Sequence, residues 1–173
     1  MVKTNINLFA EGEVVYTDGG VLAEFAWVLV VLPFIAALII TFAGKSLPLK
    51  GAEIALGTIG IIFIYSLALM YLHVTEGVAN EFFINVGNIG QFDIEFGWVV
   101  DGLSIMMYFV VGLVALLVFI YATNYMEGEI RYTFFFTSLT LFAGSMLVLV
   151  SSPTLIQILI GWELVGVLSL IHI

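Results

Sequence analysis

Residues 153–173 read PTLIQILIGWELVGVLSLIHI, a mostly apolar stretch with one acid, Glu163, near its middle. A helix rises about 1.5 Å per residue and the hydrocarbon core of a bilayer is about 30 Å thick, so this stretch is long enough to cross a membrane. Glu163 would then lie roughly 15 Å deep, near the midplane. Because a charge at that depth costs about 2.5 to 3.5 kcal/mol or more, Glu163 is the first candidate functional residue.

The composition places the whole chain in a membrane. Of its 173 residues 62% are hydrophobic and 10% are charged, whereas soluble domains are roughly half apolar and a quarter charged. The formal net charge is −9, but the acids other than Glu163 fall in connecting segments or near the ends of apolar runs. With only four basic residues and no basic patch, the sequence argues against nucleic-acid binding.

The sequence shows no catalytic centre, cofactor site or metal site of its own. Cysteine is absent, which excludes disulfides, iron–sulfur ligation and thiolate metal sites. The two histidines are far apart, and neither a Gly-rich phosphate loop nor a nucleophile elbow is present. The mixed, acidic start of the chain does not have the pattern of a cleaved signal peptide. We therefore expect no redox centre in this chain.

Five apolar runs predict an all-α, polytopic transmembrane bundle. None of the runs alternates with the period of two that a barrel strand requires. Residues 1–21 are expected to form an N-terminal extramembrane segment and residues 22–173 the bundle. Pro33 lies inside the first helix, where a kink is expected and neighbouring helices can satisfy the freed carbonyl. The predicted helices are 22–43, 52–73, 102–122, 133–150 and 153–173.

The basic residues give an orientation. Lys45 and Lys50 flank the first connection and Arg131 lies in the third, whereas residues 74–101 contain no Lys or Arg and five acids. Positive connections stay on the cytoplasmic side, so the N-terminus and residues 74–101 are placed on the opposite side. Lys3 is the one exception to the pattern.

The long connection between the second and third helices is expected to form a small extended or hairpin-like structure. It has aromatic and β-branched stretches separated by Gly87, Asn88 and Gly90. An irregular loop packed on the bundle is the alternative. Asp101 precedes the third helix, where we expect it to act as an N-cap, with proton uptake as the alternative role.

Small and hydroxyl residues in the helices suggest close packing. Glycine and serine let helix backbones approach where lipid gives no hydrophobic drive to association. Hydroxyl groups in the fourth helix can bond across an interface or, more often, back to their own helix. The residues concerned are Gly57, Gly60, Gly112, Gly144, Ser145, Gly161 and Gly166, together with Thr133, Thr137, Ser138 and Thr140.

The helical neighbours of Glu163 cannot neutralise it, because three and four residues away they are Leu159, Ile160, Gly166 and Val167. The apolar runs contain no Lys or Arg, so a partner must come from elsewhere. A carboxyl without a cation can remain neutral and exchange a proton, as a relay requires. The alternative is a protonated Glu163 that donates one structural hydrogen bond.

Other polar and aromatic residues have simpler explanations. His73 and His172 are expected near helix C-termini, where the helix dipole favours a cation. Glu53 is expected in the first turn of a helix, where the dipole favours an anion. Trp27 and Trp98 are expected at the outer interface. Trp162, next to Glu163 and deep in the membrane, is expected to serve packing.

Four motifs stand in order along the chain: DGLS at 101–104, YATNYM at 121–126, SMLVLV at 145–150 and GWELVG at 161–166. Their order and spacing resemble the N-terminal third of the antiporter-like L subunit of complex I, the proton-pumping NADH:quinone oxidoreductase. The resemblance extends from about residue 22 onward.

The resemblance implies that Glu163, the glutamate of the GWE motif, translocates protons in a pair with a lysine on a later, discontinuous helix. It also implies a translocase subunit that couples quinone reduction to proton transport within the membrane arm. NADH or reduced coenzyme F420, flavin, iron–sulfur clusters and quinone would be bound by other subunits.

The family subunit is several times longer, with two inverted repeats of five helices, so this chain is expected to be an N-terminal piece of it. After Ser169 the sequence also departs from the family pattern. Two alternatives stay open: a piece of the large subunit of an Mrp-type cation/proton antiporter, and a structural remnant without transport. A prokaryotic cytoplasmic membrane is preferred over the mitochondrial inner membrane.

Overall fold

The computed structural model of the chain describes residues 20–89 and 92–172. The expected N-terminal segment 1–21 therefore lies outside the described residues except for its last two positions. The elements of the described part are α1 (Gly20–Glu24), α2 (Trp27–Ala43), the 3-10 helix η1 (Gly44–Ser46), α3 (Ala52–Glu76), β1 (Asn80–Ile89), β2 (Phe92–Val100), α4 (Gly102–Tyr125), α5 (Tyr132–Ser151) and α6 (Leu155–His172).

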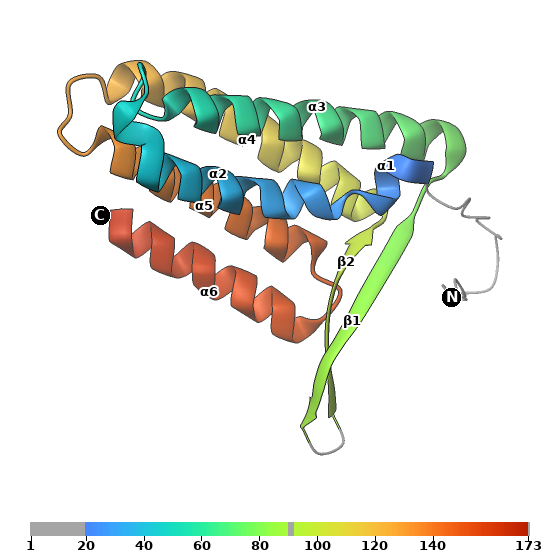
Figure 1. Cartoon of the computed structure of the whole chain (residues 1–173). Helices are drawn as coiled ribbons and strands as arrows, with labels where there is room; N and C mark the ends of the chain where they lie inside the picture. Colours follow the sequence, from blue (N-terminus) through green and yellow to red (C-terminus); the bar gives the residue numbers. More distant parts are fainter. Residues whose placement is uncertain (1–19, 90–91, 173) are drawn as a thin grey trace.

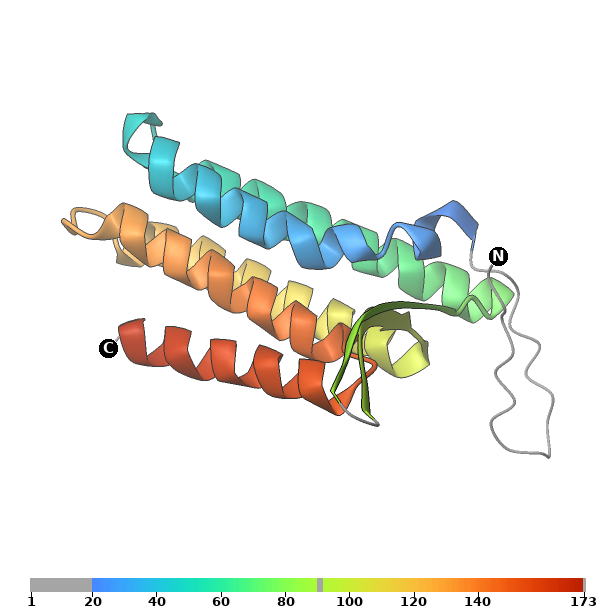
Figure 2. The ribbon, with the colours of Figure 1, turned by 60° about the horizontal axis from the view of Figure 1, so that its bottom comes forward.

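The five long helices lie side by side and alternate in direction along the chain (Figure 1). Helices α2 to α5 form the central bundle, in which α3 packs on α4 and α2 packs on α5. Helix α6 lies along the outer side of α5, as Figure 2 shows from another direction. The two strands project from one end of the bundle, and the α2–α3 and α4–α5 connections lie at the other end (Figure 1).

The expected polytopic helical fold is confirmed. Three helices, α3, α4 and α5, are long and apolar enough to cross a membrane, and α2 and α6 are shorter apolar helices. The predicted boundaries agree with the structure to within about one helical turn after residue 26. Helix α3 extends past the predicted end because Gly77, in the left-handed conformation with φ 66°, supplies the cap and donates its N–H to the His73 carbonyl.

The prediction of one continuous helix over residues 22–43 is wrong. The structure breaks it between α1 and α2, at Phe25 and Ala26. In a continuous helix the Leu22 carbonyl would accept the N–H of Ala26. Here that carbonyl accepts the Tyr65 hydroxyl at 2.6 Å, and the Ala26 N–H is 3.3 Å from the Ala23 carbonyl instead. A tertiary hydrogen bond has therefore replaced a helical one.

Strands β1 and β2 confirm the expected hairpin-like connection. They pair antiparallel, with Asn80 opposite Val100 at the base and an irregularity between Asn85 and Gly87. Trp98 of β2 stacks on Phe82 of β1, with ring centroids 4.4 Å apart. With ten and nine residues the strands are longer than the small cap that was expected.

Some of the small residues have the expected role in helix packing and others do not. A Cβ added to Gly144 of α5 would lie 3.1 Å from the Cβ of Pro33 on α2, and one added to Gly112 would lie 3.3 Å from the Cα of Phe63. Gly57 and Gly60 have open space instead. The hydroxyls of α5 mostly bond within their own helix, as expected; Thr137 bonds to Thr133 and Thr140 to Phe136.

Candidate functional site

Helix α6 carries Glu163 near its middle. The helix has 18 residues, which corresponds to a length of about 27 Å. It begins at the hairpin end of the bundle and ends near the level of the α2–α3 connection (Figure 1). Glu163 is thus about 12 Å along the helix from Leu155.

One side of α6 packs on α5, and Glu163 lies on the other side. Gln157 and Gly161 are buried and Val165 is half-buried. A Cβ added to Gly161 would lie 3.0 Å from the Cα of Leu149 on α5, so the two backbones are close there. Each residue advances about 100° around a helix, which places Glu163 about 200° from Gly161. Its side chain is exposed on the face directed away from α5.

The face of α6 around Glu163 is exposed and otherwise apolar. Gly166, on the same face, has no heavy atom within 4 Å of the point where a Cβ would be. A small residue on an open face permits close approach of another helix. The other exposed residues at helical spacing from Glu163 are Ile156, Leu159, Ile160, Val167 and Leu170.

No described residue forms a hydrogen bond or an ion pair with the Glu163 side chain. Trp162, for which packing is expected, has a side chain that is 62% exposed in the described part of the chain. Gly161 packs against α5, and the next residue, Trp162, is turned by about 100° around the helix axis. Its indole therefore lies outside the contact between α6 and α5.

The N-cap expected at Asp101 is confirmed. Its backbone is extended and its carboxylate accepts the Ser104 N–H at 2.7 Å at the start of α4. Glu53, in the first turn of α3, accepts the Leu49 N–H at 2.8 Å and so stabilises the turn before its helix.

His73 and His172 lie near the ends of two different helices, α3 and α6. His73 lies in the last turn of α3, and its Nδ1 is 2.7 Å from the Val78 carbonyl oxygen. Its ring also lies against Gly102, where an added Cβ would be 2.8 Å from Nε2. The side chain of His172 lies outside the described residues. Within residues 20–89 and 92–172 no three His, Asp or Glu side chains gather in a way that could hold a metal ion.

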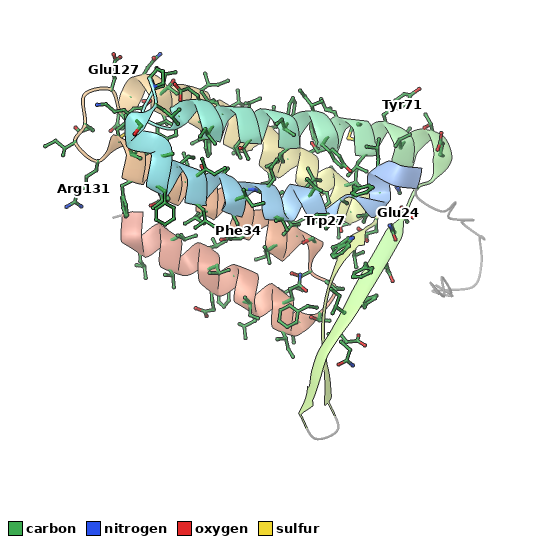
Figure 3. The ribbon with its side chains drawn as sticks, in the orientation of Figure 1. Glu24, Trp27, Phe34, Tyr71, Glu127 and Arg131 are labelled. Atoms are coloured by element: carbon green, nitrogen blue, oxygen red, sulfur yellow. The ribbon has the colours of Figure 1, made fainter. Side chains whose placement is uncertain are left out.

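The labelled side chains show which residues lie at the two ends of the bundle (Figure 3). Glu127 and Arg131 lie at the end with the short connections, and Glu24, Trp27 and Tyr71 lie at the hairpin end. Trp27 is partly exposed there, as expected for an interfacial aromatic residue. The charged residues at the two ends contrast with Glu163, which lies between them.

Two polar residues that sequence reasoning missed join α6 to the hairpin. The Gln157 side chain accepts the Gly97 N–H at 2.9 Å and donates to the Gly97 carbonyl at 2.8 Å. The Thr154 hydroxyl donates to the Glu95 carbonyl at 3.1 Å. A local signal was present, because Thr-x-x-Gln before an apolar run is the pattern of a capping box. That pattern would have located the start of α6 but not the hairpin contact.

Comparisons with known proteins agree with the resemblance found in the motifs. Residues 87–136 match the family model for the N-terminus of chain 5 of NADH-ubiquinone oxidoreductase, complex I. NAD(P)H-quinone oxidoreductase chain 5 of Synechocystis sp. is 36% identical over 155 residues, which is 86% of this chain and 23% of that protein. The chloroplastic subunit 5 of Chlorokybus atmophyticus is 35% identical over 84% of this chain, and the chromatophore subunit 5 of Paulinella chromatophora is 33% identical over 84%.

The chain spans 23% of the length of each of these three relatives. Because the similarity covers most of the chain, the chain is related to the N-terminal part of the antiporter-like subunit 5. The apolar helices and this relationship together indicate an integral membrane protein.

Proposed function

We propose that this chain, which is related to the N-terminal part of complex I chain 5, is part of the membrane arm of a proton-translocating NAD(P)H:quinone oxidoreductase, and that Glu163 transfers protons there. The relatives are named as subunits of NAD(P)H-quinone oxidoreductases. The chain contributes transport rather than electron transfer, and the other subunits bind the nicotinamide, flavin, iron–sulfur clusters and quinone.

The position of Glu163 is the observation that carries this proposal. In a membrane, the middle of an apolar helix face contacts lipid or another helix rather than water. A carboxylate there is costly unless it is protonated or a cation approaches it. The role we propose for Glu163 is therefore to carry a proton within the complete subunit. The lysine on a later helix that the family resemblance implies is the partner we propose.

The open face of α6 supports docking of that later helix. Glu163 and Gly166 lie together on the exposed face, and the opposite face is already occupied by α5. The three relatives have more than four times the aligned length, so further helices belong to the complete subunit that we propose. Those helices exclude lipid from Glu163 and provide its proton path.

We also propose that the complex lies in a prokaryotic cytoplasmic membrane rather than in the mitochondrial inner membrane. One of the similar proteins is from Synechocystis sp.. Relatives of similar identity are the chloroplastic subunit of Chlorokybus atmophyticus and the chromatophore subunit of Paulinella chromatophora.

Replacement of Glu163 by Gln tests the proposed role of the carboxyl. Glutamine keeps the size and polarity of the side chain but cannot exchange a proton at neutral pH. Because a positioned acid or base contributes about 10²- to 10⁴-fold in proton transfer, we expect proton pumping of the assembled complex to fall by about tenfold or more. Pumping is measured by the quenching of a pH-sensitive dye in inverted vesicles during NAD(P)H oxidation.

Glu53→Gln is the matched control, since it makes the same chemical change in a glutamate at a helix start. Its Oε1 accepts the Leu49 N–H, which an amide oxygen can also do, so pumping should stay near that of the parent. Native electrophoresis checks that both variants assemble. Normal pumping by an assembled Glu163→Gln complex would contradict the proposed role.

A further inference from the structure

The first turn of α6 pairs with the outer edge of β2 by hydrogen bonds of the kind that join two strands. The buried amide of Gln157 both accepts from and donates to the backbone of Gly97. In an antiparallel sheet, a hydrogen-bonded residue pair exchanges the same two bonds. The Gln157 side chain thus takes the place of a neighbouring strand residue.

Thr154 extends this pairing by one step along the same edge. Its hydroxyl donates to the carbonyl of Glu95, two residues before Gly97, and residues two apart direct their backbone groups to the same edge of a strand. The Gln157 N–H is 3.4 Å from the same hydroxyl oxygen. In a capping box the Gln side chain would return to the N-cap backbone. Here it is directed to the hairpin instead.

The hairpin offers a fixed point for this contact. A Cβ on Gly97 would overlap the Phe82 carbonyl oxygen, so the β1 backbone occupies that side of Gly97. Gln157 binds the opposite edge of the strand. Gly97 is therefore held between β1 and α6.

Together with the packing of α6 on α5, the contact fixes the direction in which Glu163 points. Besides packing on α5, α6 is bonded to the hairpin through Gln157, and Thr154 just before the helix adds a further hydrogen bond. Gln157 and Glu163 are six residues apart on one rigid helix, about 9 Å along its axis. Rotation or sliding of α6 on the largely apolar surface of α5 would break the Gln157 bonds. The same motion would turn Glu163 away from its present direction.

We propose that Gln157 is a positioning residue for Glu163. Its two hydrogen bonds to Gly97 fix the rotation and the axial position of α6 relative to the hairpin, and we call this pair of hydrogen bonds the lock. The functional part of this inference rests on the proposed role of Glu163, but the lock itself does not. The pair of hydrogen bonds, rather than the volume of the Gln side chain, is the essential feature.

The lock can be tested by measuring a distance between the hairpin and α6. The chain has no cysteine, so Phe83→Cys and Val167→Cys provide two unique sites for spin labels. Both side chains are about half exposed; Phe83 lies opposite Gly97 in the sheet, and Val167 lies one turn beyond Glu163. The distance distribution is measured by dipolar electron paramagnetic resonance on the full chain in lipid vesicles. We expect one narrow distribution for the parent chain.

Two substitutions separate hydrogen bonding from packing. Gln157→Leu keeps a similar volume without hydrogen bonds and should broaden the distribution. In Gln157→Glu, a protonated carboxyl can accept from the Gly97 N–H and donate to the Gly97 carbonyl, whereas an ionised carboxylate can only accept. The Glu variant should therefore give the narrow distribution at low pH and a broad one at high pH. Glu95 is the other acid at this edge, and the parent at the same pH values is the control for its titration.

A narrow distribution for Gln157→Leu would overturn the proposal, and so would a distribution for Gln157→Glu that does not change with pH. If the Leu variant does not insert, the Glu variant still decides, because one protein is compared at two pH values. In the assembled complex, Gln157→Leu should lower proton pumping towards the level of Glu163→Gln. If Glu163→Gln pumps normally, the proposed function fails, while the distance measurement still decides whether the lock exists.

Discussion

Gly97 has no room for a side chain, and this gives a prediction at the scale of one residue. In Gly97→Ala the new methyl group would overlap the Phe82 carbonyl oxygen. Overpacking of this kind costs about 1–3 kcal/mol, and here the obstacle is backbone, which cannot rotate away. We expect amide hydrogen exchange in residues 80–89 and 92–100 to speed up by about tenfold or more, because 1.4 kcal/mol corresponds to a factor of ten.

Gly87→Ala is the control in the same hairpin. It has no heavy atom within 4 Å of its Cβ position, so exchange should stay close to that of the parent. Equal amide exchange rates in the Gly97→Ala and Gly87→Ala variants would contradict the prediction, because they would show that a methyl group at position 97 costs no more free energy than one at position 87. Acceleration in the Gly97 variant should also extend to the first turn of α6, because Gln157 binds the Gly97 backbone.

Single residues differ in how far sequence could assign their roles. Asp101 was assigned correctly because an N-cap depends on neighbours in the chain, and its partner Ser104 is three residues away. Gln157 was missed because its partner Gly97 is sixty residues away. Glu163 was recognised from its depth in an apolar stretch, but the direction of its side chain depends on which face of α6 meets α5. No local pattern contains that information.

The cap of α4 gives a prediction at the scale of one element. Asp101→Ala leaves the Ser104 N–H without its acceptor and should lower the free energy of unfolding by about 0.5–2 kcal/mol. Asp101→Asn should stay within a few tenths of the parent, because Asn caps helices about as well as Asp. Stability is measured by denaturant titration of the purified chain in detergent.

The same pair of variants tests the alternative role of Asp101 in proton uptake. Asn can cap a helix but cannot carry a proton at neutral pH. Parental pumping by an Asp101→Asn complex would limit the residue to capping. Pumping as low in the Asn variant as in the Ala variant, with parental stability of the Asn variant, would instead assign it to the proton path.

At the scale of elements, composition predicted the helices well and tertiary contacts decided the rest. Long apolar runs predicted α3, α4 and α5 because length and hydropathy are local properties. The break between α1 and α2 was not predicted, since it depends on a hydrogen bond from Tyr65 to Leu22. Glycines show the same limit: Gly161 fits against α5 whereas Gly57 meets open space, although both were candidates for packing.

The whole molecule has two chemically different ends, and these were predicted from the distribution of basic residues. The structure brings the first and third connections to one end and the hairpin to the other (Figure 1), as an even alternation of helices requires. The direction of the bundle in the membrane was assigned from Lys45, Lys50 and Arg131.

Labelling of single cysteines from one side of the membrane tests that direction. Ser46→Cys and Glu129→Cys place thiols at exposed positions of the first and third connections, and Asn85→Cys places one on the hairpin. The chain has no native cysteine to interfere. In sealed right-side-out vesicles, a membrane-impermeant maleimide should react with position 85 only, and all three should react after lysis. Reaction at 46 and 129 but not at 85 would invert the orientation. Glu163 would remain near mid-depth in either case, since it lies near the centre of α6, but the end of α6 that Gln157 holds would then face the cytoplasm.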